Sequence, residues 1–248
     1  MRYVAFVVAY DGGAWSGSQR LTNGRSVQGE LERALEQVLK TTTTITLAGR
    51  TDAGVHATGQ VGKFATENRL PTERVPLALN PVLESTVRIV RAWDVDDGFH
   101  PRFSAKSRTY RYTFECGEVP NPLLSRIAGH ARHPLNVDAM NDAAQLLVGE
   151  HDFAAWQSAG SPNGPTIRRM LRLEVGQGEA FGTPLVEVTL EANAFLYGMA
   201  RNITGALWKV GRGELERDTL MRLHEGRDRT KCPPPARASG LCLTEVKF

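Results

Sequence analysis

Two halves of the chain show the same order of predicted secondary-structure elements. In the first half, an apolar strand at 3–10 and an amphipathic helix at 26–40 precede two strands, a short helix and a further strand. The second half repeats this order, with strands and helices predicted at 109–116, 137–149, 170–178, 184–193, 194–211 and 241–248. Two copies of one such unit predict an α+β fold, in which helices lie mainly on one face of an antiparallel sheet.

The length of the chain, 248 residues, allows one large domain or two small ones. We expect the boundary near residues 98–101, which separates an N-terminal half at 1–99 from a C-terminal half at 100–248. The longest apolar run, at 3–10, is far too short to span a bilayer and lacks the layout of a signal peptide. We therefore expect a cytoplasmic protein.

The cysteines and histidines offer little for a metal or disulfide framework. Cys116, Cys232 and Cys242 contain no C-x-x-C pair, which argues against disulfide bonds and against a structural zinc site. His130 and His133 are the closest histidines in sequence, but they lack a third ligand. We therefore expect no metal site.

Arginine makes up 24 of the 30 basic residues, although the net charge is only +3. The planar guanidinium suits phosphate and stacks on bases, but a GC-rich genome also enriches arginine, so its placement is more informative. The segment 100–114 has no acidic residue and interleaves Tyr110 and Tyr112 with basic side chains, which is typical of a strand that faces RNA. The candidates for contacts to an RNA backbone are Arg102, Lys106, Arg108, Arg111, Arg168, Arg169 and Arg172.

The stretch AGRTDAGVHATGQV, from Ala48 to Val61, places an aspartate in a glycine-rich loop between two predicted strands. An isolated Asp-x-Gly is most often a plain turn, and this interpretation competes with that of a carboxylate held towards a substrate. Three features favour the carboxylate. Arg50 supplies an opposite charge two residues from Asp52, and the following strand is expected to present a polar face of His56, Thr58 and Gln60.

The third feature is that the sequence contains no competing catalytic motif. It has no Gly-x-Ser-x-Gly, no His-Glu-x-x-His, no phosphate-binding Gly-Lys-Ser/Thr and no dinucleotide fingerprint. The sequence therefore predicts chemistry by a lone carboxylate, without a metal, nucleotide or redox cofactor.

The segment GRTDAGVHATGQV resembles the signature loop of the TruA family of tRNA pseudouridine synthases. The resemblance extends in the same order over nearly the whole chain, through the segments YDG…GSQR…SVQGELE, FHPRFSAKSRTYRY, NAFLYGMARNITG and ARASGLCLTEV. It implies an isomerase that converts uridine to pseudouridine in the anticodon stem-loop of tRNA (tRNA positions 38–40). It also implies a homodimer, whose subunits each form one extended antiparallel sheet from two α+β halves.

The resemblance also implies roles for individual residues. Asp52 falls on the catalytic nucleophile, and Tyr110 falls on the residue that contacts the target base. Arg201 falls on the basic residue that pairs with the catalytic aspartate, and Arg50 is a candidate for binding phosphate or orienting the loop. Without the resemblance, Tyr110 reads as one of a row of aromatic strand residues, and Arg201 as a residue on a solvated helix face.

Two positions depart from the family pattern. Ser18 stands where the family usually has an aromatic residue, which changes the expected packing of the N-terminal loop. Gly198 stands where a bulkier residue is common, inside the helix expected at 194–211. A glycine in a helix interior costs about 1 kcal/mol relative to alanine, so we expect a looser turn before Arg201.

Three chemical routes remain open for an ionised Asp52: attack at C1′, attack at C6 of the base, or removal of a proton from C2′.

Two other classes of protein also remain as alternatives to a pseudouridine synthase. An RNA-binding module of the same fold would lack catalysis, and a carboxylate glycoside hydrolase would need a second carboxylate, for which the sequence offers no obvious partner.

Overall fold

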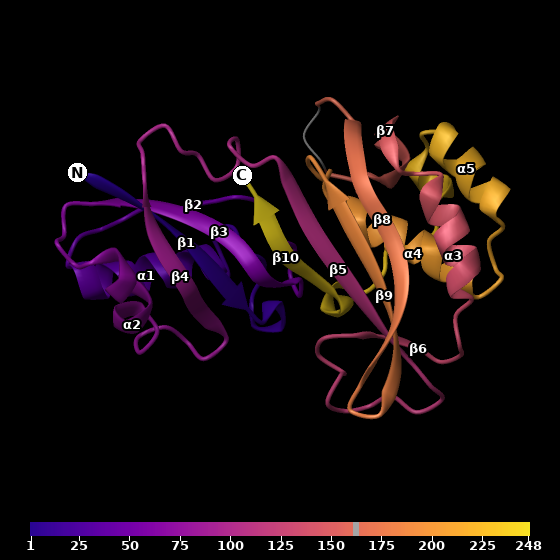
Figure 1. The fold of residues 1–248 in the computed structure, drawn as a ribbon, viewed down its shortest axis with the longest axis horizontal. Coiled ribbons are helices and arrows are strands. Elements are labelled where there is room, and N and C mark those ends of the chain that lie inside the picture. The colour runs from indigo at the N-terminus through magenta and orange to yellow at the C-terminus, as the bar shows by residue number, and fades with distance from the viewer. Residues whose placement is uncertain (161–163) are drawn as a thin grey trace. The chain divides into compact units, whose positions relative to one another are not determined.

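The computed structural model describes residues 1–160 and 164–248, which form two compact units (Figure 1). Unit 1 comprises Met1–Lys106 and Cys242–Phe248, and unit 2 comprises Ser107–Leu241. The division expected at residue 99 lies inside unit 1. The chain thus leaves unit 1 after Lys106 and returns to it with its last strand.

The sheet of unit 1 has the strand order β4-β1-β3-β10, with the short β2 paired to β3. Both neighbours of β1 run antiparallel to it, whereas β10 pairs with β3 in the parallel direction through Cys242 and Leu243. The strands are β1 (Arg2–Tyr10), β2 (Thr46–Leu47), β3 (His56–Thr66), β4 (Val87–Val95) and β10 (Leu241–Lys247).

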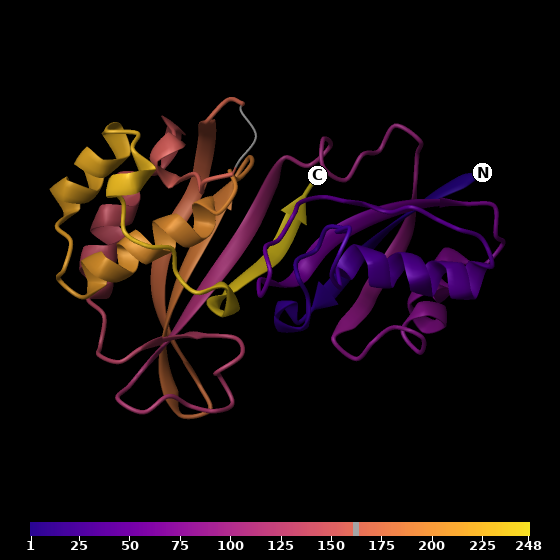
Figure 2. The ribbon, with the colours of Figure 1, turned by 180° about the vertical axis from the view of Figure 1, so that it is seen from behind.

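Two helices, α1 (Val27–Leu39) and α2 (Val75–Leu79), lie on one face of this sheet (Figure 2). Ser26 caps α1 as predicted, because its side chain accepts a hydrogen bond from the backbone N–H of Gly29. The helix buries an apolar stripe of Val27, Leu31, Ala34, Leu35 and Leu39. Two 3-10 turns complete the unit, η1 (Gly12–Ala14) and η2 (Thr72–Arg74).

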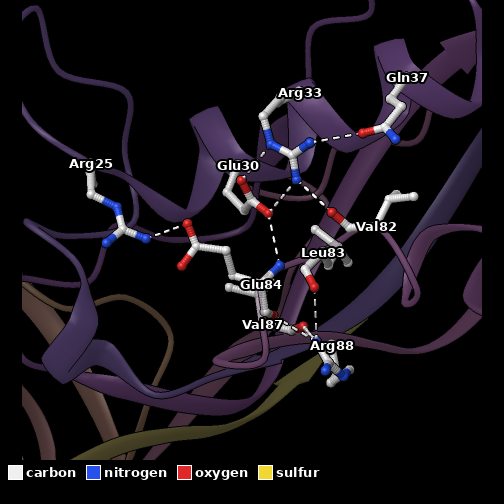
Figure 3. Close-up of polar contacts among 9 residues, drawn as sticks. All are labelled: Arg25, Glu30, Arg33, Gln37, Val82, Leu83, Glu84, Val87 and Arg88. Carbon is white, nitrogen blue, oxygen red and sulfur yellow. Dashed lines mark hydrogen bonds and ion pairs between the residues drawn. The ribbon is translucent and has the colours of Figure 1, made fainter.

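A polar network ties α1 to the segment between α2 and β4 (Figure 3). The carboxylate of Glu30 accepts two bonds from Arg33, at 2.7 and 2.8 Å, and a third from the backbone N–H of Glu84 at 2.9 Å. Arg33 also donates to the carbonyl of Val82, and Arg25 forms an ion pair with Glu84. The first turns of α1 are therefore held to a loop that is distant in sequence.

In unit 2 the strands follow the order β5-β9-β8-β7, with β6 paired parallel to β5. The other pairings are antiparallel. The three- and four-residue strands β6 and β7 are not predicted by the sequence, because such short segments show no periodicity. The strands are β5 (Ser107–Cys116), β6 (Gly129–Ala131), β7 (Gly149–Asp152), β8 (Ile167–Ala180) and β9 (Thr183–Ala192).

The helices of unit 2 gather on one side of its sheet (Figure 2). They are α3 (Val137–Gln145), α4 (Met199–Gly211) and α5 (Arg217–Glu225), with 3-10 turns η3 (Ala154–Trp156), η4 (Arg229–Lys231) and η5 (Ala238–Gly240). The predicted α+β class is confirmed in both units. No helix in the described parts of the chain is both long and apolar enough to cross a membrane.

The prediction that α4 begins at residue 194 and contains Gly198 in its interior is wrong. Gly198 is the residue before the helix, with φ +71°, a conformation that favours glycine. A Cβ at this position would lie 2.0 Å from Oγ of Ser158. The expected loosening of a helix interior therefore does not arise, because Gly198 is the N-cap residue of α4, and Met199 and Ala200 separate it from Arg201.

Candidate active site

Arg50 and Asp52 lie on the loop of unit 1 that joins β2 to β3. Arg50 is exposed and Asp52 is half-buried. The backbone N–H of Val55 donates to the backbone carbonyl of Asp52 at 3.1 Å, and Gly54 has φ +81°. The segment is therefore a turn, as one of the two interpretations predicted, and backbone groups close it.

Thr51, the residue before Asp52, is anchored at all three of its polar atoms. Its backbone N–H donates to Oγ of Ser18 at 2.8 Å, and its carbonyl accepts from the backbone N–H of Ser18 at 3.0 Å. Its side-chain Oγ1 lies 2.8 Å from the hydroxyl of Tyr10, the last residue of β1. Thr51 is only 5% exposed, so these bonds are shielded from water.

Gln60 supports the same loop from β3. Its Nε2 donates to the carbonyl of Gly49 at 2.8 Å and to the hydroxyl of Tyr10 at 3.4 Å. Burial raises the pKa of Tyr10 to about 12, although hydrogen bonds from Thr51 and Gln60 act in the opposite direction. Tyr10 therefore remains a neutral phenol that bridges Thr51 and Gln60.

The expected polar cleft face of β3 is wrong for two of its three residues. Thr58 is exposed, but Gln60 is fully buried and His56 is 7% exposed. The backbone N–H of Gly12 donates to Nδ1 of His56 at 3.1 Å, and Oδ1 of Asp11 lies 3.3 Å from the same nitrogen. These side chains face the interior of the unit, where Nδ1 of His56 and Nε2 of Gln60 bond to protein groups beside the loop.

The segment that follows β1 packs closely against the loop. The backbone N–H of Gly54 donates to the carbonyl of Gly12 at 3.2 Å, and a Cβ on Gly12 would lie 2.0 Å from the carbonyl oxygen of Val55. A Cβ on Gly49, by contrast, would have no atom within 4 Å. Gly12 therefore permits a close backbone approach, whereas the space beside Gly49 is open.

Tyr110 lies in unit 2, on β5 opposite Leu190 of β9, and is 8% exposed. Its ring meets that of Phe195 edge to face, with centroids 4.9 Å apart. Tyr112 pairs instead with Phe114, at 4.5 Å between ring centroids. Tyr110 therefore contacts a residue from the connection between β9 and α4 as well as belonging to the aromatic row of its strand.

Arg201 lies in the first turn of α4, also in unit 2, and is half-buried. Its Nε donates to the carbonyl of Ala236 at 2.9 Å, and the backbone N–H of Ala236 donates to the carbonyl of Arg201 at 2.9 Å. Burial raises the pKa of nearby Tyr112 to about 12, and the charge of Arg201 partly opposes this shift. Arg201 is thus held by the segment before β10, and is not a freely solvated residue of a helix face.

The structure narrows the set of candidate phosphate contacts. Arg108 is 9% exposed and donates to the carbonyl of Asn193 at 2.8 Å, so it is a structural residue. Two others pair with carboxylates: Arg111 with Glu187 at 3.6 Å and Arg172 with Glu174 at 2.6 Å. Arg102, Lys106 and Arg169 are also exposed and stay candidates for contacts to phosphate.

Among residues 1–160 and 164–248, no cluster of three or more histidine, cysteine or acidic side chains could hold a metal ion. Nε2 of His130 bonds to the carbonyl of Gly117 at 2.7 Å.

Of the predicted site residues, Arg50 and Asp52 share one loop of unit 1, and Tyr110 and Arg201 belong to unit 2. The roles of Tyr10 and Thr51 were not predicted from the sequence; for Tyr10, the available signal was a polar residue at the end of a buried strand.

Comparison with known proteins identifies a family that matches most of the chain. Residues 6–104 and 143–248 match the family described as tRNA pseudouridine synthase; Asp52 and Arg201 lie inside this match and Tyr110 lies between its two parts. The tRNA pseudouridine synthase A of Roseiflexus sp. (strain RS-1) is 41% identical over 248 residues, which cover 100% of this chain and 91% of the relative. The enzyme of the same name from Moorella thermoacetica is 40% identical over 250 residues and 100% of both chains.

These matches, together with the carboxylate loop, place the protein in the class of RNA-modifying isomerases. The chain belongs to the tRNA pseudouridine synthase family. The resemblance to the TruA family that the loop indicated is thereby confirmed, and it extends over the full length of the chain.

Proposed function

We propose that this protein isomerises uridine to pseudouridine in the anticodon stem-loop of tRNA, with Asp52 as the nucleophile. The observation that carries the proposal is the anchorage of Thr51, which fixes the backbone from which a half-buried carboxylate extends. A positioned carboxylate can act as a nucleophile without an activating base.

The reaction needs little beyond that carboxylate and a bound uridine. The N1–C1′ bond breaks, the base turns, C5 bonds to C1′ and the proton on C5 leaves. Neither electrons nor phosphate are transferred. Asp52 can act by attack at C1′, by attack at C6 or by removing the C2′ proton, and each route begins from the same side chain.

We assign the other predicted residues to substrate binding. A uridine in a stem must turn out of the stack, at a cost of a few kcal/mol, and stacking on an aromatic ring returns about 1–3 kcal/mol. Tyr110 is the proposed platform for the base. The exposure of Arg50 suits a contact to phosphate, and Arg201 adds positive charge in the C-terminal half of the chain, residues 100–248.

We also propose that the protein acts in the cytoplasm as a homodimer that binds tRNA. The names of its relatives support tRNA as the partner. The dimer is implied by the family resemblance, and the oligomeric state is measurable by sedimentation of the full chain.

The test is release of tritium from tRNA labelled at C5 of uridine. We expect release by the wild-type protein and none by Asp52→Asn, with unchanged far-UV circular dichroism. Asp96→Asn is the matched control, because Asp96 is an exposed aspartate of the same unit. Full release by Asp52→Asn would overturn the assignment of the nucleophile. Binding of tRNA without release by the wild-type protein would favour an inactive RNA-binding module.

A further inference from the structure

Ser18 is fully buried and contacts Thr51 through two separate groups. Its hydroxyl oxygen accepts from the backbone N–H of Thr51 at 2.8 Å, and its own backbone N–H donates to the carbonyl of Thr51 at 3.0 Å. One serine therefore satisfies both backbone polar groups of the residue that precedes Asp52.

These two bonds restrict the direction in which Asp52 leaves the loop. Each peptide unit is planar, so a bond to its N–H or carbonyl fixes the orientation of the whole plane. The N–H of Thr51 belongs to the plane shared with Arg50, and its carbonyl belongs to the plane shared with Asp52. Ser18 thus holds both planes that meet at the Cα atom of Thr51.

Ser18 is itself attached to a rigid element. Its carbonyl accepts from the backbone N–H of Gln28, in the first turn of α1, at 2.9 Å. Its neighbour Gly17 has φ +110° and approaches so closely that a Cβ would lie 3.0 Å from the carbonyl oxygen of Thr51. The connection therefore runs from α1 through Ser18 to the loop.

We propose that Ser18 is a positioning residue, whose hydroxyl fixes Thr51 and thereby aligns the Asp52 carboxylate for reaction. The inference rests on the proposed function of Asp52. Alanine at position 18 would leave the buried N–H of Thr51 without this acceptor, and the loop would gain freedom. A misplacement of about 1 Å in a reacting group can lower turnover about 100-fold.

The experiment compares Ser18→Ala with Ser26→Ala. Ser26 is also a buried serine of unit 1 whose Oγ accepts from a backbone N–H, that of Gly29 at 3.2 Å, but it does not bond to Thr51. For Ser18→Ala we expect kcat to fall about 10- to 100-fold, while KM for tRNA stays within about twofold. Ser26→Ala is expected to lose stability by weakening a helix cap and to keep the wild-type kcat.

A second readout does not depend on activity. Hydrogen exchange at the amide of Thr51 is expected to be at least about tenfold faster in Ser18→Ala than in the wild-type protein, and unchanged in Ser26→Ala. Ser18→Cys retains a weak acceptor in the side chain, so its kcat and exchange rate are expected to fall between those of serine and alanine.

The inference is overturned if Ser18→Ala keeps the wild-type kcat, or if Ser26→Ala lowers kcat as much. Rapid exchange at Thr51 in the wild-type protein would overturn it as well. Absence of tritium release by the wild-type protein would defeat the proposed function, while protection of the Thr51 amide that disappears in Ser18→Ala would still establish the contact.

Discussion

The hydroxyl of Tyr10, at the end of β1, lies 2.8 Å from Oγ1 of Thr51, the residue before Asp52. Gln60 of β3 donates to the same hydroxyl and to the loop carbonyl of Gly49. The first strand of the chain and the strand after the loop therefore share one buried polar centre. A buried polar network of this kind is favourable only when each of its polar groups has a hydrogen-bond partner.

Tyr10→Phe is expected to destabilise the protein. The substitution keeps the ring but removes the partner of both Thr51 and Gln60, and an unsatisfied buried polar group costs about 1–3 kcal/mol. Urea unfolding measures the effect. Tyr197→Phe is the control, because Tyr197 is 52% exposed and its substitution is expected to change stability by less than about 0.5 kcal/mol. Equal stability of the two variants would contradict the role of the centre.

Gly12→Ala and Gly49→Ala are expected to differ although both glycines adjoin the loop. A Cβ at Gly12 would overlap the backbone of Val55, so we expect a loss of about 1–3 kcal/mol or more from the shift that follows. A Cβ at Gly49 meets nothing within 4 Å, so its stability should match that of the wild-type protein. Thermal unfolding of the two variants tests the prediction, and a stable Gly12→Ala variant would be inconsistent with the close approach.

Tyr110→Phe and Tyr110→Ala distinguish two roles of a tyrosine that contacts a base: stacking by the ring and chemistry or hydrogen bonding by the hydroxyl. A stacking platform needs the ring, so Tyr110→Phe is expected to keep most of its kcat/KM. Loss of stacking in Tyr110→Ala corresponds to about 1–3 kcal/mol, a decrease of about 5- to 150-fold. Tritium release under single-turnover conditions measures both variants. If the phenylalanine variant were as slow as the alanine variant, the hydroxyl would be the essential group.

The protein is expected to become less stable as pH decreases, because of His224 in unit 2. This side chain is 4% exposed, and its Nδ1 accepts from Nε1 of Trp156 at 3.0 Å. Burial and the charge of His151 lower the pKa of His224 to about 4, although Asp152 acts in the opposite direction. The unfolded histidine has a pKa of about 6.5, so between these values the unfolded state binds more protons and is favoured as pH falls.

The comparison is between the wild-type protein and His224→Gln, which retains an acceptor for Trp156 but does not titrate. Urea unfolding between about pH 7.5 and 5 is expected to show a steeper loss of stability in the wild-type protein. Below about pH 4 the contribution of His224 no longer changes. Parallel curves for the two proteins would show that His224 does not titrate differently on unfolding.

Local features made several elements predictable. The cap at Ser26 and the apolar spacing of α1 depend only on neighbouring residues, and the structure places the helix at Val27–Leu39 as expected. The apolar pattern of α4 also holds, but it continues past the true start of the helix. Gly198 precedes the helix with φ +71°, and Ser158, distant in sequence, occupies the space where another side chain would lie.

The sequence by itself determined the α+β class, the main helices and strands, the family and the loop that carries Asp52, because periodicity, turn residues and a contiguous motif are local properties. Only the tertiary structure decided which residues hold that loop. Tyr10 and Ser18 are distant from the loop along the chain, and strand pairing together with burial brings their polar atoms and those of Gln60 to it. The same packing buries the side chains of His56 and Gln60, which bond to the backbone groups of Gly12 and Gly49. The alternation of residues along β3 could not predict this, because a period of two does not say which face of a strand is exposed to water.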